Sequence, residues 1–320
     1  MDPVERDLFS PATALAARAG DLYREDPSWL VRTARLAAEE GRAPVAPVTI
    51  AARGEAASIR TQDPARVRAE VEGLLMAANP DIGLQWLHDA GLLAVLLPEL
   101  EATVGFAQEA GRRHKDVWAH TKQVVKQAAE RPAVRWAALL HDIGKVPTRT
   151  FTAQGKVHFH RHAEVGARMF DEVGRRFAME RPFFRQVRFL ILHHLRANQY
   201  DRSWTDSAVR RFHREMEEHL LDLVALSRAD ITSRRAERHR QVRENLDDLS
   251  ARMKALREED QRMPPLPSGI GDAIMSSLAL GPGPRVGQLK RRLEEAIERG
   301  ELEPRREMEY YTAWLQAQPE

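Results

Sequence analysis

The sequence contains no cysteine among its 320 residues. This absence excludes disulfide bonds, thiolate zinc sites and cysteine nucleophiles, so any metal ion would have to be held by nitrogen and oxygen ligands. An excess of charge is also lacking, because the formal net charge is only +2. A nearly neutral chain has no overall basic field that would by itself indicate nucleic-acid binding.

Targeting signals and long apolar runs are missing as well. The start, MDPVERDLFS, has neither a basic region nor an apolar core, and so does not read as a secretory signal. No apolar run reaches the roughly 18 residues that a membrane span requires. We therefore expect a cytoplasmic protein with no membrane partner.

Alternating strand patterns are scarce, whereas helical spacing recurs along the chain. The spacing predicts a helix over 28–41 that Gly41 terminates, and a helix within 64–80 that opens at Pro64. It also predicts two short helices within 82–100 that are separated at Gly91. The expected fold class is all-α.

Arginine is abundant, at 42 of the 49 basic residues. A GC-rich genome would explain this preference, and selection for forked phosphate contacts is the alternative. Nine basic and seven acidic residues lie within 234–262, so we predict one long, solvated helix from Ser227 to about Arg262. The Pro/Gly-rich stretch 263–272 reads as a linker, and 279–302 as a turn followed by a helix.

Histidine is concentrated in the middle of the chain, with ten of the twelve between 114 and 219. The stretch RWAALLHDIGKVPTRT (135–150) ends an apolar run with adjacent metal-capable side chains, His141 and Asp142. The candidate metal ligands are His120, His141, Asp142, His162, His194 (or its neighbour His193) and Asp230. Each except Asp142 falls on a different predicted helix, so a bundle would bring them to one point.

Four imidazoles and two carboxylates suit one or two divalent ions such as Mn, Ni, Co, Fe or Zn, and Asp142 could bridge two of them. A lone histidine on a helix is more often a hydrogen-bonded surface or core residue. That reading is preferred for His114, His158, His160, His213 and His219.

The pattern H…HD…D in a helical context resembles the HD-domain superfamily of metal-dependent phosphohydrolases, and LLHDIGK matches its core motif. The resemblance implies that a first ion is held by His120, His141, Asp142 and Asp230. It further implies that His162 and His194 bind a second ion in the two-metal members, with Asp142 between the two ions.

A broader resemblance covers nearly the whole chain. REDPSWLVRTARLAAEEG, ARVRAEVEGLL and GLLAVLLPEL are similar, in that order, to the neck and body of bacterial tRNA nucleotidyltransferases and poly(A) polymerases that carry an HD domain. The implied organisation is a neck- and body-like helical region (1–106), an HD phosphohydrolase domain (107–235), a long charged helix (236–262) and a linker with a small helical tail (263–320).

The nucleotidyltransferase head of that family would precede the neck, and the sequence begins at the neck. The family's neck motif Glu-Asp-x-x-Arg reads EDPSW here, with Trp29 at the arginine position. Because tryptophan cannot donate the forked hydrogen bonds of a guanidinium, nucleotide addition is expected to be lost and the neck to serve as scaffold.

The expected activity is metal-dependent hydrolysis of a nucleotide or an RNA-terminal phosphate, above all a 2′,3′-cyclic phosphodiester as the resemblance implies. Lys145 could contact Asp142 or a phosphate oxygen, and the candidate phosphate ligands are Arg196, Arg210, Arg211 and Arg234, with Thr205 or Asp206 capping the helix that carries two of them. Three alternatives remain open: another HD phosphatase, nucleotidase or nucleotide hydrolase, a non-catalytic tRNA- or RNA-binding module, and a nucleotidyltransferase that borrows a head from another chain. No protein partner is predicted.

Overall fold

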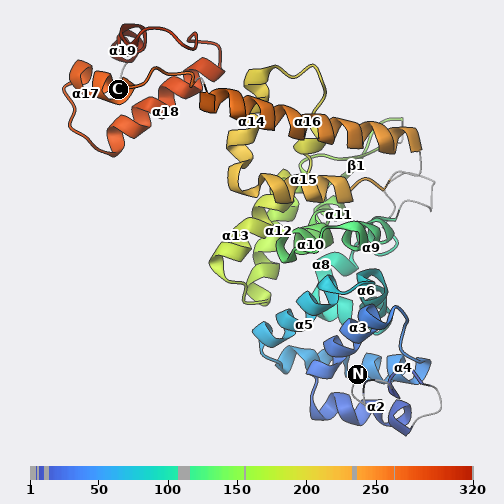
Figure 1. Ribbon diagram of the computed structural model, residues 1–320. Coiled ribbons are helices and arrows are strands. Elements are labelled where there is room, and N and C mark those ends of the chain that lie inside the picture. Colours follow the sequence, from blue (N-terminus) through green and yellow to red (C-terminus); the bar gives the residue numbers. More distant parts are fainter. Residues whose placement is uncertain are drawn as a thin grey trace. The chain divides into compact units, whose positions relative to one another are not determined.

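The described part of the chain folds mainly into helices, as the computed structural model shows (Figure 1). The structure describes residues 5, 7–10, 14–106, 116–154, 156–232, 236–262 and 264–318. The predicted all-α class is confirmed, since the only sheet among these residues is the hairpin of β1 (Arg149–Phe151) and β2 (Val157–Phe159). Within the described ranges, no helix is long and apolar enough to cross a membrane.

The described chain divides into two compact units, which are treated separately. The first unit contains residues 1–199 and 219–242, and the second contains residues 200–218 and 243–320. The domain boundaries expected at 107, 236 and 263 stay predictions. The two units are defined by contacts between residues, and their limits fall at other positions.

The N-terminal part of the first unit is a set of helices in which α3 packs against α5 and α6. The predicted ends of these helices are confirmed: Gly41 terminates α3 with φ 71°, Pro64 begins α5, and Gly91, with φ 71°, separates α6 from α7. The Asp63 carboxylate, which was not predicted, caps α5. Their bounds are α2 Ala14–Glu25, α3 Ser28–Glu40, α4 Ala46–Glu55, the 3-10 helix η1 Ala56–Thr61, α5 Pro64–Met76, α6 Pro80–Asp89, α7 Leu92–Leu96 and α8 Pro98–Glu101.

The rest of the first unit packs around α10, whose residues 133–140 are all buried. This helix contacts α5, α9, α13 and α15, and α12 lies against α13 (Figure 1). A helix that is buried on every side needs such a surrounding, because every face must be covered. The bounds are α9 Val117–Gln127, α10 Pro132–Leu140, α11 Lys145–Thr148, α12 His162–Arg176, α13 Arg181–His193, η2 Ala197–Gln199 and α15 Leu220–Ala229.

One buried cation joins the two parts of the first unit. Arg135 is 3% exposed, and its guanidinium donates to the carbonyl oxygens of Leu75, Ala77 (3.0 Å) and Ala128 (3.3 Å). The first two carbonyls lie at and just beyond the end of α5, where helical partners run out. Burial lowers the pKa of Arg135, although Glu130 opposes this.

Replacing Arg135 with Met should therefore lower the free energy of unfolding by about 2–4 kcal/mol, because three carbonyls would be left buried without donors. Urea denaturation followed by circular dichroism measures this. The control is Arg131→Met, which removes an exposed ion pair with Asp222 and should cost no more than about 1 kcal/mol. Equal losses in the two variants would contradict this role.

The prediction of one continuous helix from Ser227 to about Arg262 was wrong. α15 ends at Ala229, residues 231–232 are not helical, and α16 begins at Ala236. The Gln127 amide donates to the carbonyl oxygens of Ala229 and Ile231 and so holds the break in place. Charge patterning could not reveal this break, because the interactions that stabilise it come from α9.

The second unit has its own core and three C-terminal helices, rather than a linker and a single helix. Within the expected linker 263–272, the described residues 264–272 belong to a core, because Leu266 and Ile270 are buried with Ile274, Leu293 and Tyr311. The predicted cap of α14 is confirmed, since the Thr205 hydroxyl accepts from Ala208 N–H. The bounds of the remaining helices are α14 Asp206–Met216, η3 Glu217–His219, α16 Ala236–Arg262, α17 Ile270–Leu278, α18 Pro284–Glu298 and α19 Met308–Gln316. Of α16, the residues from Arg243 onwards belong to this unit.

Candidate metal centre

Six of the side chains selected from the sequence meet at one place in the first unit. Only His120 lies within a helix, whereas the others lie at or just beyond helix ends. Their positions are His120 on α9, His141 directly after α10, Asp142 beside it, His162 at the start of α12, His194 directly after α13 and Asp230 directly after α15. The neighbouring His193 instead packs its ring on Phe189, with centroids 4.3 Å apart.

The first group of donor atoms consists of His120, His141 and Asp230. The two Nε2 atoms are 3.3 Å apart, and Asp230 Oδ1 lies 3.0 Å from His120 Nε2 and 3.5 Å from His141 Nε2. An ion with bonds of about 2.0–2.1 Å has neighbouring ligands about 3.0–3.4 Å apart. These three donors therefore have the spacing of ligands around one divalent ion.

The second group consists of Asp142, His162 and His194. The Nε2 atoms of His162 and His194 are 3.2 Å apart, and Asp142 Oδ1 lies 3.6 Å from His162 Nε2. The other carboxylate oxygen, Asp142 Oδ2, is 3.2 Å from His141 Nε2 and 3.5 Å from His120 Nε2. The two oxygens of Asp142 thus face different groups, which is the arrangement of a bridging carboxylate.

All four imidazoles present Nε2 because their Nδ1 atoms are used elsewhere. His141, His162 and His194 each place Nδ1 within 2.7–2.9 Å of the carbonyl oxygen three residues earlier. His120 Nδ1 is 2.8 Å from Thr232 Oγ1. A donating Nδ1–H leaves Nε2 as the lone-pair atom of a neutral ring, and such second-shell partners orient metal-bound histidines. Paired Nε2 lone pairs at 3.2–3.3 Å repel unless a metal ion or a proton lies between them.

The electrostatics of the centre also favour added positive charge. Burial lowers the pKa of His141, but the charge of Asp142 and hydrogen bonds to both carboxylates outweigh this and raise it to about 10. Burial lowers the pKa of His194 to about 4. Burial tends to raise the pKa of Asp142, yet His141 and Lys145 hold it well below its usual range. The carboxylates therefore stay ionised and, with no metal bound, draw a proton onto His141.

Exchanging Thr232 for Val should weaken metal binding by about 10–100-fold, since the hydrogen bond that orients His120 would be lost without a large change in volume. Competition with a fluorescent chelator measures the affinity. The free energy of unfolding without metal should change by less than about 1 kcal/mol, the usual net worth of one hydrogen bond. An unchanged affinity would mean that Thr232 does not orient the ligand.

The raised pKa of His141 adds a pH dependence to the stability of the metal-free protein. Its pKa is 6.5 when unperturbed and about 10 in the fold, so its contribution to stability is complete below about 6.5 and declines as the pH rises towards 10. Melting temperatures in chelator should fall between pH 7 and 9, and less steeply in His141→Gln. Equal slopes for the two proteins would contradict the predicted proton on His141.

The predicted phosphate ligands lie in different parts of the chain. Lys145 Nζ contacts Asp142 Oδ2 at 2.7 Å, and Arg196 follows His194 by two residues. Arg210 and Arg211 belong to the second unit, and Arg211 is exposed there. Arg234 lies outside the described residues.

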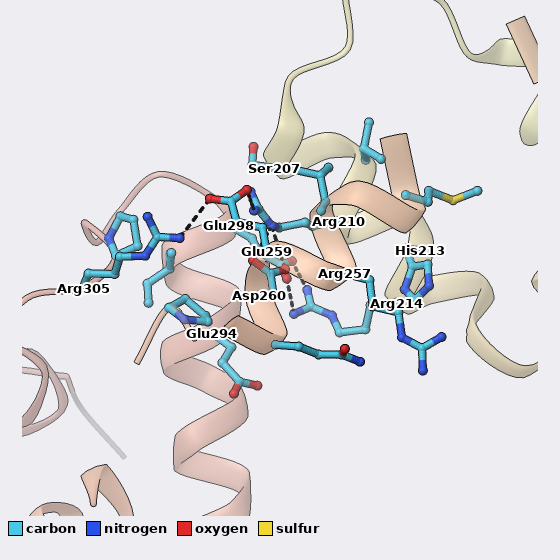
Figure 2. Close-up of a pocket in the computed structure, with 17 residues that line it drawn as sticks. Ser207, Arg210, His213, Arg214, Arg257, Glu259, Asp260, Glu294, Glu298 and Arg305 are labelled. Atoms are coloured by element: carbon cyan, nitrogen blue, oxygen red, sulfur yellow. Dashed lines mark hydrogen bonds and ion pairs between the residues drawn. The ribbon is translucent and has the colours of Figure 1, made fainter. Parts of the chain in front are cut away.

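Arg210 lines a cavity of about 600 Å³ within the second unit (Figure 2). Its guanidinium already binds Asp260 at 2.8 Å and Glu259 at 3.1 Å. Glu259 also binds Arg305 at 3.0 Å, so the Glu259 carboxylate is shared between two arginines. A role for Arg210 as a phosphate ligand stays a prediction.

Sequence reasoning missed two residues that support the centre, Thr232 and Gln127. Thr232 lies two residues after Asp230 and meets the ring of His120. Gln127 lies two turns after His120 on α9 and brackets Asp230 by donating to the carbonyls on either side of it. The i, i+7 spacing of His120 and Gln127 was the only sequence signal for this arrangement.

Comparison with known proteins connects this geometry to two families. Residues 117–235 match the model of the HD domain, and residues 47–103 match the model described as the probable RNA and SrmB-binding site of polymerase A. The chain therefore contains an HD domain, whose matched range includes all six candidate ligands.

The chain is also a relative of bacterial tRNA nucleotidyltransferases. It is 32% identical over 265 residues to the A-adding tRNA nucleotidyltransferase of Deinococcus radiodurans, covering 79% of this chain and 59% of that protein. It is 34% identical over 250 residues to the CC-adding tRNA nucleotidyltransferase of Thermus thermophilus, covering 74% of this chain and 53% of that protein. The chain thus spans between about half and three fifths of the length of these curated relatives.

Proposed function

We propose that this chain is a metal-dependent phosphohydrolase whose preferred substrate carries a 2′,3′-cyclic phosphate, either as a free nucleotide or at an RNA end. The observation that carries the proposal is the position of the Asp142 carboxylate, whose two oxygens face two separate groups of imidazole Nε2 atoms. The relation to tRNA nucleotidyltransferases and the match to an RNA-binding model favour a nucleotide or RNA substrate.

The chain's own residues would act mainly by holding and orienting. His120, His141 and Asp230 would hold one ion, and His162 and His194 a second, with Asp142 shared. A divalent ion bound here supplies polarisation of phosphate oxygens and lowers the pKa of a water.

Lys145 keeps Asp142 ionised and lies beside it, where it would neutralise charge on an incoming phosphate. Arg196 is the second proposed phosphate contact. Burial of Asp142, His141 and His194 limits competing water around the donor atoms.

The test is a substrate panel with purified protein and added Mn²⁺, Ni²⁺, Co²⁺ or Zn²⁺. The panel contains bis(p-nitrophenyl) phosphate, 2′,3′-cyclic AMP, 2′-AMP, 3′-AMP, a dNTP and ppGpp. We expect the cyclic phosphodiester to be hydrolysed fastest. Faster hydrolysis of a monoester or a triphosphate would show that the enzyme has a different substrate. If no compound is hydrolysed with any metal, the proposal is refuted.

RNA binding without catalysis is the second candidate, and the match over residues 47–103 favours it. The contacts of Asp26 favour a scaffold role for the neck-like segment, because its carboxylate is used within the fold. Asp26 accepts from Ser28 N–H at the start of α3 and pairs with Arg66 at 3.0 Å. Salt-sensitive binding of a tRNA by a protein inactive across the panel would favour this reading. The proposed function requires hydrolysis as well as binding.

A further inference from the structure

The segment from Ile143 to Ala163 carries more positive charge than the proposed reaction uses. It contains no aspartate or glutamate, but has four lysine or arginine residues, three histidines and two phenylalanines. The whole chain has 49 basic and 47 acidic residues, so an acid-free stretch of this length is a local departure from balance. The segment includes the β1–β2 hairpin, in which Arg149 pairs with Phe159 and Phe151 with Val157.

Alternating cations and rings form a continuous track over this hairpin. The Lys145 ammonium lies 5.7 Å from the Phe159 ring, and the rings of Phe159 and Phe106 are 6.2 Å apart. The Arg149 guanidinium lies 4.2 Å from the Phe106 ring and 5.6 Å from that of Phe151. Every contact in the track lies within cation–π or aromatic-pair range.

The two ends of the track lie in different surroundings. At the inner end, Lys145 contacts Asp142 at 2.7 Å, and the Phe159 carbonyl accepts from His162 Nδ1 at 2.9 Å. At the outer end, Phe151 is 61% exposed and so offers a free ring face. The track therefore runs from the candidate metal ligands to an aromatic surface in solvent.

We propose that this hairpin is a stacking platform for single-stranded nucleic acid, on which a base stacks against Phe151 while the backbone phosphates meet Arg149 and Lys145. Basic side chains interleaved with aromatic rings are the features that bind single strands without sequence preference. A protein partner would not need an acid-free segment, and double-stranded RNA would not present a base face. The placement of the terminal phosphate at the metal ligands rests on the proposed function.

The platform makes the site selective for an oligonucleotide end over a free mononucleotide. A mononucleotide whose phosphate lies at the metals has no second base to reach the outer ring. An oligonucleotide has one, and each stacked base strengthens binding by roughly 5–150-fold.

Binding is tested with a fluorescein-labelled 2′-O-methyl tetra-adenylate, which has no 2′-hydroxyl and cannot become a cyclic phosphate. Fluorescence anisotropy should show about tenfold weaker binding by Phe151→Ala, with wild-type affinity in Phe151→Trp. The matched control is Leu221→Ala, which removes another exposed apolar side chain (75% exposed) and should leave the affinity unchanged. Wild-type affinity in Phe151→Ala would overturn the platform.

Kinetics separate the platform from the proposed function. With a tetranucleotide ending in a 2′,3′-cyclic phosphate, Phe151→Ala should raise KM about tenfold and leave kcat within about twofold. With 2′,3′-cyclic AMP, neither constant should change. Equal effects on the two substrates would overturn the selectivity. If no substrate is hydrolysed and Phe151→Ala still weakens anisotropy binding, the platform stands and the proposed function fails.

Discussion

Asp142→Ala should abolish hydrolysis and cost the protein at least one of its two ions, because this carboxylate alone faces both groups of imidazoles. Its two oxygens lie within 3.2–3.6 Å of Nε2 atoms in both groups. The loss of kcat/KM should be at least about 10³-fold, since a metal supplies several kcal/mol of transition-state stabilisation. Removal of any one imidazole should have a smaller effect, because the other group would remain.

The comparison variant is Asp171→Ala on α12, which breaks a partly exposed ion pair with Arg188 and should keep activity and metal content. Circular dichroism and size-exclusion chromatography establish that both variants fold. A folded Asp142→Ala protein with wild-type activity would refute the proposed catalytic centre. A folded variant that retains both ions would refute the bridging role.

Gly144→Ala should disrupt the second group of ligands while leaving the first in place. Gly144 has an ordinary φ of −68°, so the restriction comes from space rather than from backbone conformation. An added Cβ would overlap the carbonyl oxygen of His162 and lie 2.6 Å from Gly166 N. Both are backbone atoms of α12, so no side-chain rotation relieves the overlap, and the start of α12 must move away from Asp142.

The unfolding free energy should fall by about 1–3 kcal/mol, and metal analysis should find at most one ion per chain. The control is Gly54→Ala on α4, where an added Cβ meets nothing within 4 Å. That variant should be as stable as the parent or slightly more so, because alanine is the better helix former. If the Gly144→Ala protein binds two ions and is as stable as the parent, the start of α12 does not have to move away from Asp142.

The sequence predicted the helical class and several helix ends because those features are local. Gly41, Pro64 and Gly91 act on the residues beside them, and the structure confirms all three. The break after Asp230 was not predictable in the same way. Its hydrogen bonds come from His120 and Gln127, more than 100 positions earlier, and no local pattern carries that information.

The candidate ligands were identified by residue type and order, which the sequence displays directly. Their placement at helix ends was not foreseen, although it has a simple cause. At the end of a helix the carbonyl oxygens have no helical partner, so His141 and His194 can each use the carbonyl three residues earlier to fix Nδ1. The metal-binding roles of all six residues remain predictions.

The central claim is that the donors of the first unit hold two divalent ions that share Asp142. Anomalous scattering from crystals of the manganese-loaded protein, recorded on both sides of the metal absorption edge, tests it most directly. The account predicts two peaks about 3.5–4 Å apart, one beside His120, His141 and Asp230 and the other beside His162 and His194. A map with no peak among these side chains, or with peaks that Asp142 does not contact, would contradict it.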